Sequence, residues 1–144
     1  MDNPYWKFRV RQIARDKKIP VIMGTDNGDG NIVDIERYDI EKSYPFFHGL
    51  AGDLSAEKLK EMTLRELPGV AAKIAGANLA PKRMLESVAQ VGKTLYSWPQ
   101  LGTAANMCGS SLAYLARHII LKNSKIKSGR YEINLDTIFR KKLS

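Results

Sequence analysis

The stretch that decides the fold is IPVIMGTDNGDGNIVDIE, at residues 19–36. Its first five residues form a short apolar run, which is typical of a buried strand. The NG and DG dipeptides at residues 27–30 tolerate positive φ angles and predict a turn. After the turn, Val33 and Ile35 alternate with acidic residues, as side chains do along a strand. The stretch therefore predicts two strands joined by a hairpin loop. A phosphate-binding loop is disfavoured, because a strand and not a helix follows the glycines.

A helix is predicted before the first of these strands. Asn3 is a good N-cap, and Pro4 suits the first helical position, where its missing N–H would have no partner. Apolar residues then recur at helical spacing as far as Ala14. Residues 1–40 are therefore expected to form a helix followed by two strands.

The rest of the chain is expected to be mainly helical. An aromatic stretch at residues 44–47 predicts a loop that packs against another part of the chain. Residues 55–122 contain helix starts such as Ser55 and a long final helix near residues 99–122. A C-terminal strand and a short helix are predicted over residues 128–140. The sequence thus indicates a single α/β domain with a few strands and a largely helical remainder.

Composition limits the classes of protein to consider. The chain has 144 residues, a formal net charge of +8 and one cysteine. No stretch approaches the ~20 apolar residues that span a bilayer, and an internal disulfide is excluded, so we expect a cytoplasmic protein without a membrane partner. The basic residues are spread along the chain apart from one C-terminal cluster. Without a recognition-helix motif beside them, this argues against a nucleic-acid reader, which stays the last alternative.

The chemistry-bearing residues are few. His48, His118 and Cys108 do not provide the four ligands of a structural zinc site. Cys108 lies inside a predicted helix with no neighbouring cation, so a buried, inert thiol is expected. Asp26 and Asp29 lack the spacing of a calcium-binding loop. No catalytic residue is assignable from spacing alone.

One helix carries small residues at every fourth position. Ala105, Gly109 and Ala113 form a flat stripe on the predicted long helix. Such a stripe lets a second backbone approach closely, either within the chain or across a homo-oligomer. The stripe supports an alternative function, a non-catalytic dimerisation or protein-interaction module.

Several short motifs follow one another in a recognisable order. They are Asp2-Asn3, Lys7, and the runs at residues 19–25, 34–39, 47–50 and 97–101. In this order they resemble the C-terminal portion of the ThiF/MoeB/HesA-like (ubiquitin-activating-type) adenylating fold. The likeness is to a bacterial branch in which this domain is often joined to a nitroreductase-like domain. The resemblance implies the C-terminal half of a Rossmann-like domain.

The resemblance also implies a cofactor and site residues. The complete protein is expected to bind ATP and Mg²⁺, with Asp2 associated with the metal and Asn3 beside it. Lys7 stands where the family usually has arginine, at a phosphate contact. The family's nucleotide-binding half, with its G-x-G-x-x-G turn, is not found before Asp2. We therefore expect a fragment or subunit of an ATP-dependent adenylating protein that is not catalytically competent alone. No cofactor is expected for this chain by itself, and its partner would be the missing N-terminal half or another subunit.

The resemblance also bears on the later steps of the family's chemistry. The paired zinc-binding cysteines of many of these enzymes are missing, and so is an acceptor cysteine. Thioester transfer by this chain is therefore not expected.

Overall fold

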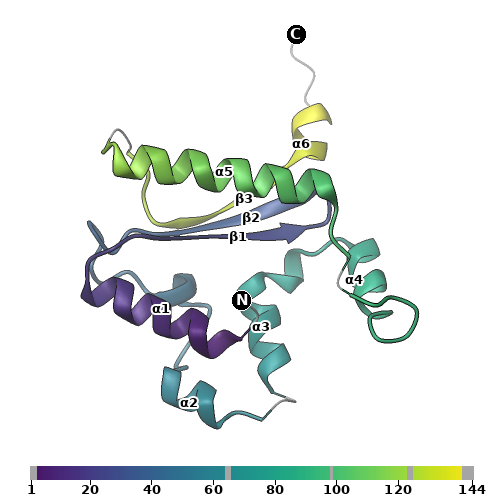
Figure 1. Ribbon diagram of the computed structural model, residues 1–144, viewed down its shortest axis with the longest axis horizontal. Helices are drawn as coiled ribbons and strands as arrows, with labels where there is room; N and C mark the ends of the chain where they lie inside the picture. Colours follow the sequence, from purple (N-terminus) through teal and green to yellow (C-terminus); the bar gives the residue numbers. More distant parts are fainter. Residues whose placement is uncertain (1–2, 64–65, 98, 123–124, 141–144) are drawn as a thin grey trace. The chain divides into compact units, whose positions relative to one another are not determined.

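The computed structural model describes residues 3–63, 66–97, 99–122 and 125–140. It is a mixed α/β structure, about half helical, with one three-stranded antiparallel sheet (Figure 1). The strand order is β1-β2-β3, so β1 and β3 are the edges. The strands are β1 (Val21–Asn27), β2 (Gly30–Glu36) and β3 (Gly129–Asn134). The described α-helices are α1 (Pro4–Asp16), α2 (Ala56–Glu61), α3 (Leu67–Ala75), α4 (Lys82–Val88), α5 (Gly102–Ile120) and α6 (Leu135–Arg140), and 3₁₀ turns occur at Phe46–Gly49 and Ala77–Leu79.

Contacts divide the chain into two compact units, and each strand contributes residues to both. The first unit comprises the described residues within Met1–Ile22, Asp34–Asn78 and Lys125–Arg130. The second unit comprises those within Met23–Val33, Leu79–Ser124 and Tyr131–Ser144.

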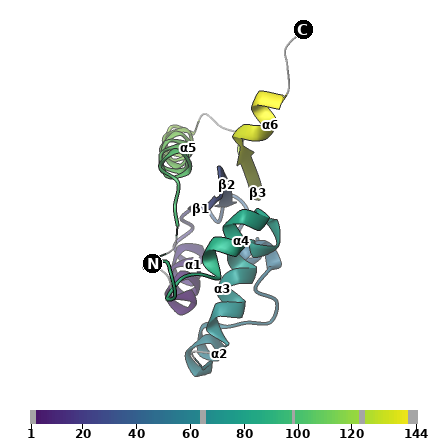
Figure 2. The same cartoon turned by 90° about the vertical axis from the view of Figure 1, so that its right-hand side faces the viewer.

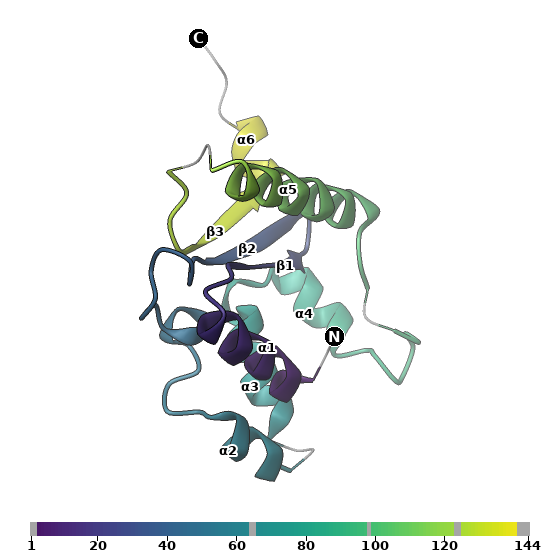
Figure 3. The same ribbon diagram turned by 60° about the vertical axis from the view of Figure 1, so that its left-hand side comes forward.

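The first unit is built around one face of α1. Asn3 caps this helix, and its Oδ1 accepts a hydrogen bond from Tyr5 N at 2.9 Å. Phe8 is buried and packs edge-on against Phe46, with the ring centroids 5.0 Å apart. Helices α2 and α3 lie beside α1, as Figures 2 and 3 both show. The aromatic loop is therefore folded against α1, which confirms that prediction.

Helix α1 ends in a left-handed residue that is not glycine. Lys18 has a φ of 54°, and Ile19 N donates to Ala14 O at 2.8 Å. This is the bond pattern of a Schellman motif, in which the left-handed position is usually glycine. The lysine side chain therefore adds strain at this helix end.

We expect Lys18→Gly to raise the free energy of unfolding by about 0.5–1 kcal/mol, because glycine adopts the left-handed conformation without a steric penalty. Urea denaturation of the 144-residue chain measures the change. The control is Lys17→Gly. Lys17 has a φ of −85°, so the same substitution should be destabilising there. Equal effects at both positions would contradict the explanation.

The predicted hairpin is confirmed, and it is tighter than expected. Strand β1 continues through Gly24 as far as Asn27, so the turn consists of Gly28 and Asp29 alone. Gly28 has a φ of 66°, the left-handed conformation that the turn requires. All seven residues of β2 are buried, including the acidic ones. The acidic side chains of β2 therefore lie inside the structure and not on a solvated face.

The second unit packs α5 against its part of the sheet, and Figure 2 looks along this helix. Ile32, Val33 and Ala104 are almost completely buried. Asn31 Nδ2 donates to Ala104 O at 3.0 Å, which ties the start of β2 to α5. Strand β3 passes close to Gly30, where a Cβ atom would lie 2.7 Å from Ile133 O.

The helix boundaries agree with the capping signals in the sequence. Ser55 Oγ accepts from Lys58 N at the start of α2, and Gly76 ends α3 with a φ of 82°. The predicted helix at residues 99–122 is α5, shorter at both ends. The C-terminal strand and helix are β3 and α6. Asp2, Trp98 and the last basic residues, 141 and 142, lie outside the described residues.

Candidate functional site

The site residues predicted from the sequence lie at the start of α1. Asn3 is the N-cap, and Lys7 follows one turn later and is partly buried. Asp2, the predicted metal-associated residue, lies outside the described residues. The first turn of α1 carries no acidic residue. The partial positive charge of the helix N-terminus is therefore left without a carboxylate in that turn.

Lys7 belongs to a row of cations along α1. Arg11 and Arg15 follow it at intervals of four residues, which places all three on one side of the helix. Arg11 is 2% exposed, and its Nε lies 2.5 Å from Glu36 Oε2. Arg15 Nη2 donates to Tyr44 O at 2.6 Å. Among the described residues, the amino group of Lys7 has no hydrogen-bond or ion-pair partner.

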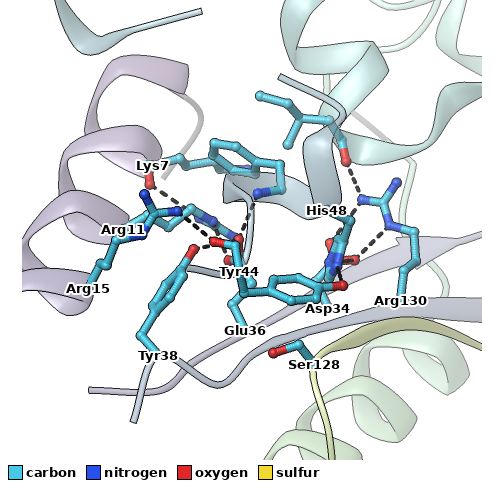
Figure 4. Close-up of polar contacts among 12 residues, drawn as sticks. Lys7, Arg11, Arg15, Asp34, Glu36, Tyr38, Tyr44, His48, Ser128 and Arg130 are labelled. Atoms are coloured by element: carbon cyan, nitrogen blue, oxygen red, sulfur yellow. Dashed lines mark hydrogen bonds and ion pairs between the residues drawn. The ribbon is translucent and has the colours of Figure 1, made fainter. Parts of the chain in front are cut away.

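Glu36 is the centre of the first buried polar cluster (Figure 4). It is fully buried, and its Oε1 accepts from Tyr38 OH at 2.9 Å and from Phe47 N at 2.6 Å. Arg11 neutralises the carboxylate and also stacks on the Phe47 ring, 3.8 Å from its centroid. Burial and then the charge and hydrogen bond of Glu36 raise the pKa of Tyr38. Tyr38 is therefore held as a neutral donor, and the cluster fixes α1 to β2.

Asp34, two residues earlier on the same face of β2, is the centre of a second cluster (Figure 4). Arg130 binds it through two hydrogen bonds, Nε to Oδ1 at 2.6 Å and Nη2 to Oδ2 at 2.9 Å. His48 Nε2 lies 3.0 Å from Oδ1, and His48 Nδ1 lies 3.0 Å from Tyr44 OH. Arg130 also donates to Ile74 O at the end of α3. This cluster joins β2, β3, α3 and the aromatic loop within the first unit.

The electrostatics of Asp34 follow from these contacts. Burial by itself raises the pKa of Asp34. The hydrogen bonds and charges of Arg130 and His48 outweigh burial, so the pKa lies below its ordinary value. The carboxylate is therefore ionised at neutral pH, and its charge is balanced inside the fold by Arg130.

The loop between these clusters is held in an unfavourable conformation. Phe47 and His48 have φ angles of 51° and 57°, both in the left-handed region. Each such residue costs roughly 1–2 kcal/mol relative to the right-handed form. The contacts with Glu36 and Asp34 offset this cost. The loop is thus shaped by the two β2 carboxylates and not by its own sequence preference.

The Glu36 cluster positions α1, and the Asp34 cluster positions the aromatic loop that packs against it. Both carboxylates are buried and satisfied by cations. Through Arg11, Glu36 orients α1, which carries Asn3 and Lys7 at its N-terminal end. We therefore regard the α1 N-terminus as the candidate site and the clusters as its support.

Sequence reasoning missed the supporting clusters. Asp34 and Glu36 were assigned to the face of β2 opposite Val33 and Ile35, and their burial was not anticipated. The available signal was an acidic pair inside a strand of otherwise apolar character. Arg11, which lies at the helical spacing of the buried residues, was a second signal.

The second unit contains Cys108, which the sequence predicts to be inert. Its Sγ lies so close to β1 that a Cβ atom on Gly24 would be 2.2 Å away. Burial, followed by the charge and hydrogen bond of Asp26, raises the pKa of the Cys108 thiol. A raised pKa keeps the sulfur protonated and makes it a poor nucleophile. Cys108 is partly and not fully buried, and its inertness stays a prediction.

Within the described ranges, no three or more His, Cys, Asp or Glu side chains form a group able to hold a metal ion. The described helices include none that is both long enough and apolar enough to cross a membrane.

An uncharacterised protein of Mycobacterium tuberculosis (strain CDC 1551 / Oshkosh) is 34% identical to the chain over 129 residues. The match covers 90% of this chain and 18% of the relative, so the chain spans about a fifth of that protein's length. No family model and no solved structure matches the chain.

Proposed function

We propose that this chain is one part of a ThiF-like, ATP-dependent adenylating or nucleotide-binding protein, and that it is not catalytically competent alone. In this proposal it forms the C-terminal half of a Rossmann-like domain. The missing N-terminal half, or another subunit, supplies the glycine-rich nucleotide turn.

The electropositive start of α1 carries the proposal. An anion is favoured at this end by the helix N-terminus and by Lys7. The first turn carries no acidic residue that would repel it. Arg11 and Arg15 in the same row are already engaged, whereas Lys7 has no partner among the described residues. Lys7 is therefore the cation left for a ligand. The resemblance implies that an Asp-Asn pair and a basic residue about one turn later take part in nucleotide binding, and Asn3 and Lys7 lie at the N-cap and one turn into α1.

The residues present fit a phosphate better than a complete nucleotide. Lys7 offers a single point charge, where an arginine would offer a planar fork. Asn3 and Lys7 would contact ATP phosphates, and Asp2 would associate with Mg²⁺. When bound, ATP would supply an adenylyl group to a substrate carboxylate, with pyrophosphate as the leaving group. The side chains of this chain would contribute orientation and charge neutralisation.

The length of the mycobacterial relative supports the proposal that the chain is part of a larger protein. The segment that resembles this chain makes up 18% of that relative. A larger polypeptide of this kind has room for an upstream nucleotide-binding half and for a further domain.

Calorimetric titration with ATP and Mg²⁺ tests the proposal. We expect no tight binding by the 144-residue chain and measurable binding by the full polypeptide that its gene encodes. In that polypeptide, Lys7→Ala should weaken binding about tenfold, the effect of losing one phosphate contact worth ~1.4 kcal/mol. Lys17→Ala, at the other end of α1, is the control and should change affinity little.

Two outcomes of this titration would contradict the proposal. Tight binding by the 144-residue chain alone would show that it is competent without a partner. No binding by the full polypeptide would remove the adenylating function altogether.

An interaction module is the second candidate, and the structure gives it one supporting observation. Ala105, Gly109 and Ala113 are all exposed on α5, and a Cβ atom on Gly109 would meet nothing within 4 Å. The small-residue stripe therefore has no partner element at Gly109 within the described chain. Gly109 therefore makes no close contact with another described part of the chain. We propose that it contacts a second copy of the chain.

We expect Gly109→Ala to stabilise the isolated chain by up to about 1 kcal/mol, because alanine favours the helix and meets open space. If the stripe joins two copies, Gly109→Leu should shift a dimer to monomer by overfilling the contact. Thermal denaturation and sedimentation velocity measure the two effects. A chain that is monomeric before and after the change would rule out the dimer.

Nucleic-acid binding is the last candidate and rests on the net charge of +8. Electrostatic binding of this kind weakens steeply with salt. A gel-shift experiment at low salt with no complex would remove it.

A further inference from the structure

Helix α1 has an apolar side that its own chain leaves exposed. Val10 is 43% exposed and Ile13 is 45% exposed, although both lie in the middle of the helix. Ile19, just before β1, is 49% exposed. Phe8 and Ala14 on the same helix are buried. The helix therefore carries more apolar surface than the described chain covers.

These residues line an open groove of about 440 Å³. Val10, Ile13 and Ala14 form its helical wall, and residues 19–22 form the other wall. All of them belong to the first unit. The lining is almost wholly apolar, so the groove suits hydrocarbon side chains and not a polar ligand.

In the second wall of the groove, Val21 and Ile22 are the first residues of β1, which is an edge strand. Among the strands of the described residues, β1 has a neighbour, β2, on one side only. Backbone N–H and C=O groups on the other side of an edge strand point outward, where they form a template for another extended segment. Neighbouring strands lie about 4.8 Å apart, whereas a helix with its side chains is about 10 Å wide. A helix beside the last strand therefore has room to cover one more strand.

We propose that the groove is the docking site of an extended segment that pairs with Val21 and Ile22 at the start of β1 and packs apolar side chains against Val10 and Ile13. The segment belongs to the larger polypeptide outside these 144 residues. This inference rests on the proposed function, in which the chain is part of a larger protein. It adds where the missing part docks and in what conformation.

The length of the mycobacterial relative and the positive charge of this chain favour such a segment over a second copy of the chain. The matched relative holds most of its residues outside the segment that resembles this chain. A second copy would instead bring together two chains of formal charge +8. Lys17 and Lys18 are exposed beside the groove, and Asp16 offsets only one of them. The segment is therefore expected to alternate apolar residues and to carry acidic residues near Lys17 and Lys18.

Thiol labelling tests whether the groove is covered. Ile13→Cys and Ile40→Cys are made separately in a Cys108→Ser background and compared in the 144-residue chain and in the full polypeptide that the gene encodes. Ile40 is the matched control, because it is 51% exposed and does not line the groove. Both thiols should react with a maleimide at similar rates in the isolated chain. In the full polypeptide, the thiol at position 13 should react at least ~10-fold more slowly, since it is reached only by local opening, and the thiol at position 40 should be unchanged.

Hydrogen exchange tests whether the occupant is a strand. Amides at the start of β1, residues 21 and 22, should exchange more slowly in the full polypeptide than in the isolated chain. A covered thiol without slower exchange would overturn the strand assignment. Equal labelling at position 13 in both proteins would overturn the docking site. Slow labelling in the isolated chain together with a dimer in sedimentation would assign the groove to a second copy. A gene that encodes only these 144 residues would also overturn the proposal.

The outcome is separable from that of the proposed function. A covered groove in a polypeptide that does not bind ATP would leave the docking site in place and remove the adenylating function. ATP binding with an uncovered groove would leave the adenylating function in place and remove the docking site.

Discussion

Arg11→Met is expected to lower the free energy of unfolding by about 3–5 kcal/mol, because removing one partner of a buried ion pair leaves an uncompensated buried charge. Glu36 is fully buried, and Arg11 is the cation that lies against its carboxylate. The remaining partners of Glu36, Tyr38 OH and Phe47 N, are neutral donors that do not replace the lost charge. Chemical denaturation monitored by circular dichroism measures the change.

The control is Arg9→Met, on the same helix. Arg9 is only partly buried and bonds to Gln12, so its replacement should change stability by no more than about 0.5 kcal/mol. The double variant Arg11→Met/Glu36→Met should recover part of the loss, since an apolar pair of similar volume needs no counter-charge. Recovery should be incomplete, because Phe47 N loses its acceptor. Equal effects of Arg11→Met and Arg9→Met would contradict the importance of the buried pair.

Asp34→Asn should cost about 3 kcal/mol at pH 7, by the same physical argument applied to the Arg130 pair, and the cost should depend on pH. The pKa of Asp34 in the folded protein is below its ordinary value, whereas the unfolded chain has a value near ~3.9. The ionised carboxylate therefore stabilises the fold above about pH 4. This stabilisation is lost as the pH falls through the folded-state pKa. The stability difference between the native chain and Asp34→Asn should thus narrow below about pH 4.

Urea denaturation from pH 7 to pH 2.5 measures this difference. Asp53→Asn is the control, because Asp53 is exposed. The stability difference between Asp53→Asn and the native chain should stay small at every pH. A difference for Asp34→Asn that is the same at pH 7 and pH 2.5 would contradict the role of the ionised carboxylate.

The two predictions also bear on the candidate site. Arg11 and Asp34 lie in the clusters that hold α1 and the aromatic loop against β2. Variants that weaken these clusters should reduce any ATP binding by the full polypeptide through the position of Lys7. Lys7→Ala should reduce binding without affecting stability. This contrast distinguishes Arg11 and Asp34, which support the site, from Lys7, which would contact the ligand.

Local signals predicted the elements well. Asn3 and Pro4 marked the start of α1, and the glycine turn marked the hairpin, because caps and turns depend on a few neighbouring residues. Ser55 likewise marked the start of α2. The boundaries of β1 were less well predicted, since a strand continues through Gly24 when its neighbours supply the pairing.

The candidate site was only partly predictable. Asn3 and Lys7 were named by resemblance, and the structure places both at one end of α1. The clusters that support this end were missed. Arg130 and Asp34 are 96 residues apart in the sequence, and Arg11 and Glu36 belong to different elements. No local pattern links such pairs.

The sequence by itself thus determined where helices, turns and strands begin, because short-range sterics and hydrogen bonds set these points. Only the tertiary structure decided that the acidic side chains of β2 are buried and paired with Arg11 and Arg130. It also decided that Val10 and Ile13 remain exposed while Phe8 is buried. The physical reason is that burial depends on which other segments lie against a helix or strand. A strand pattern is the same whether its polar face meets water or a guanidinium group.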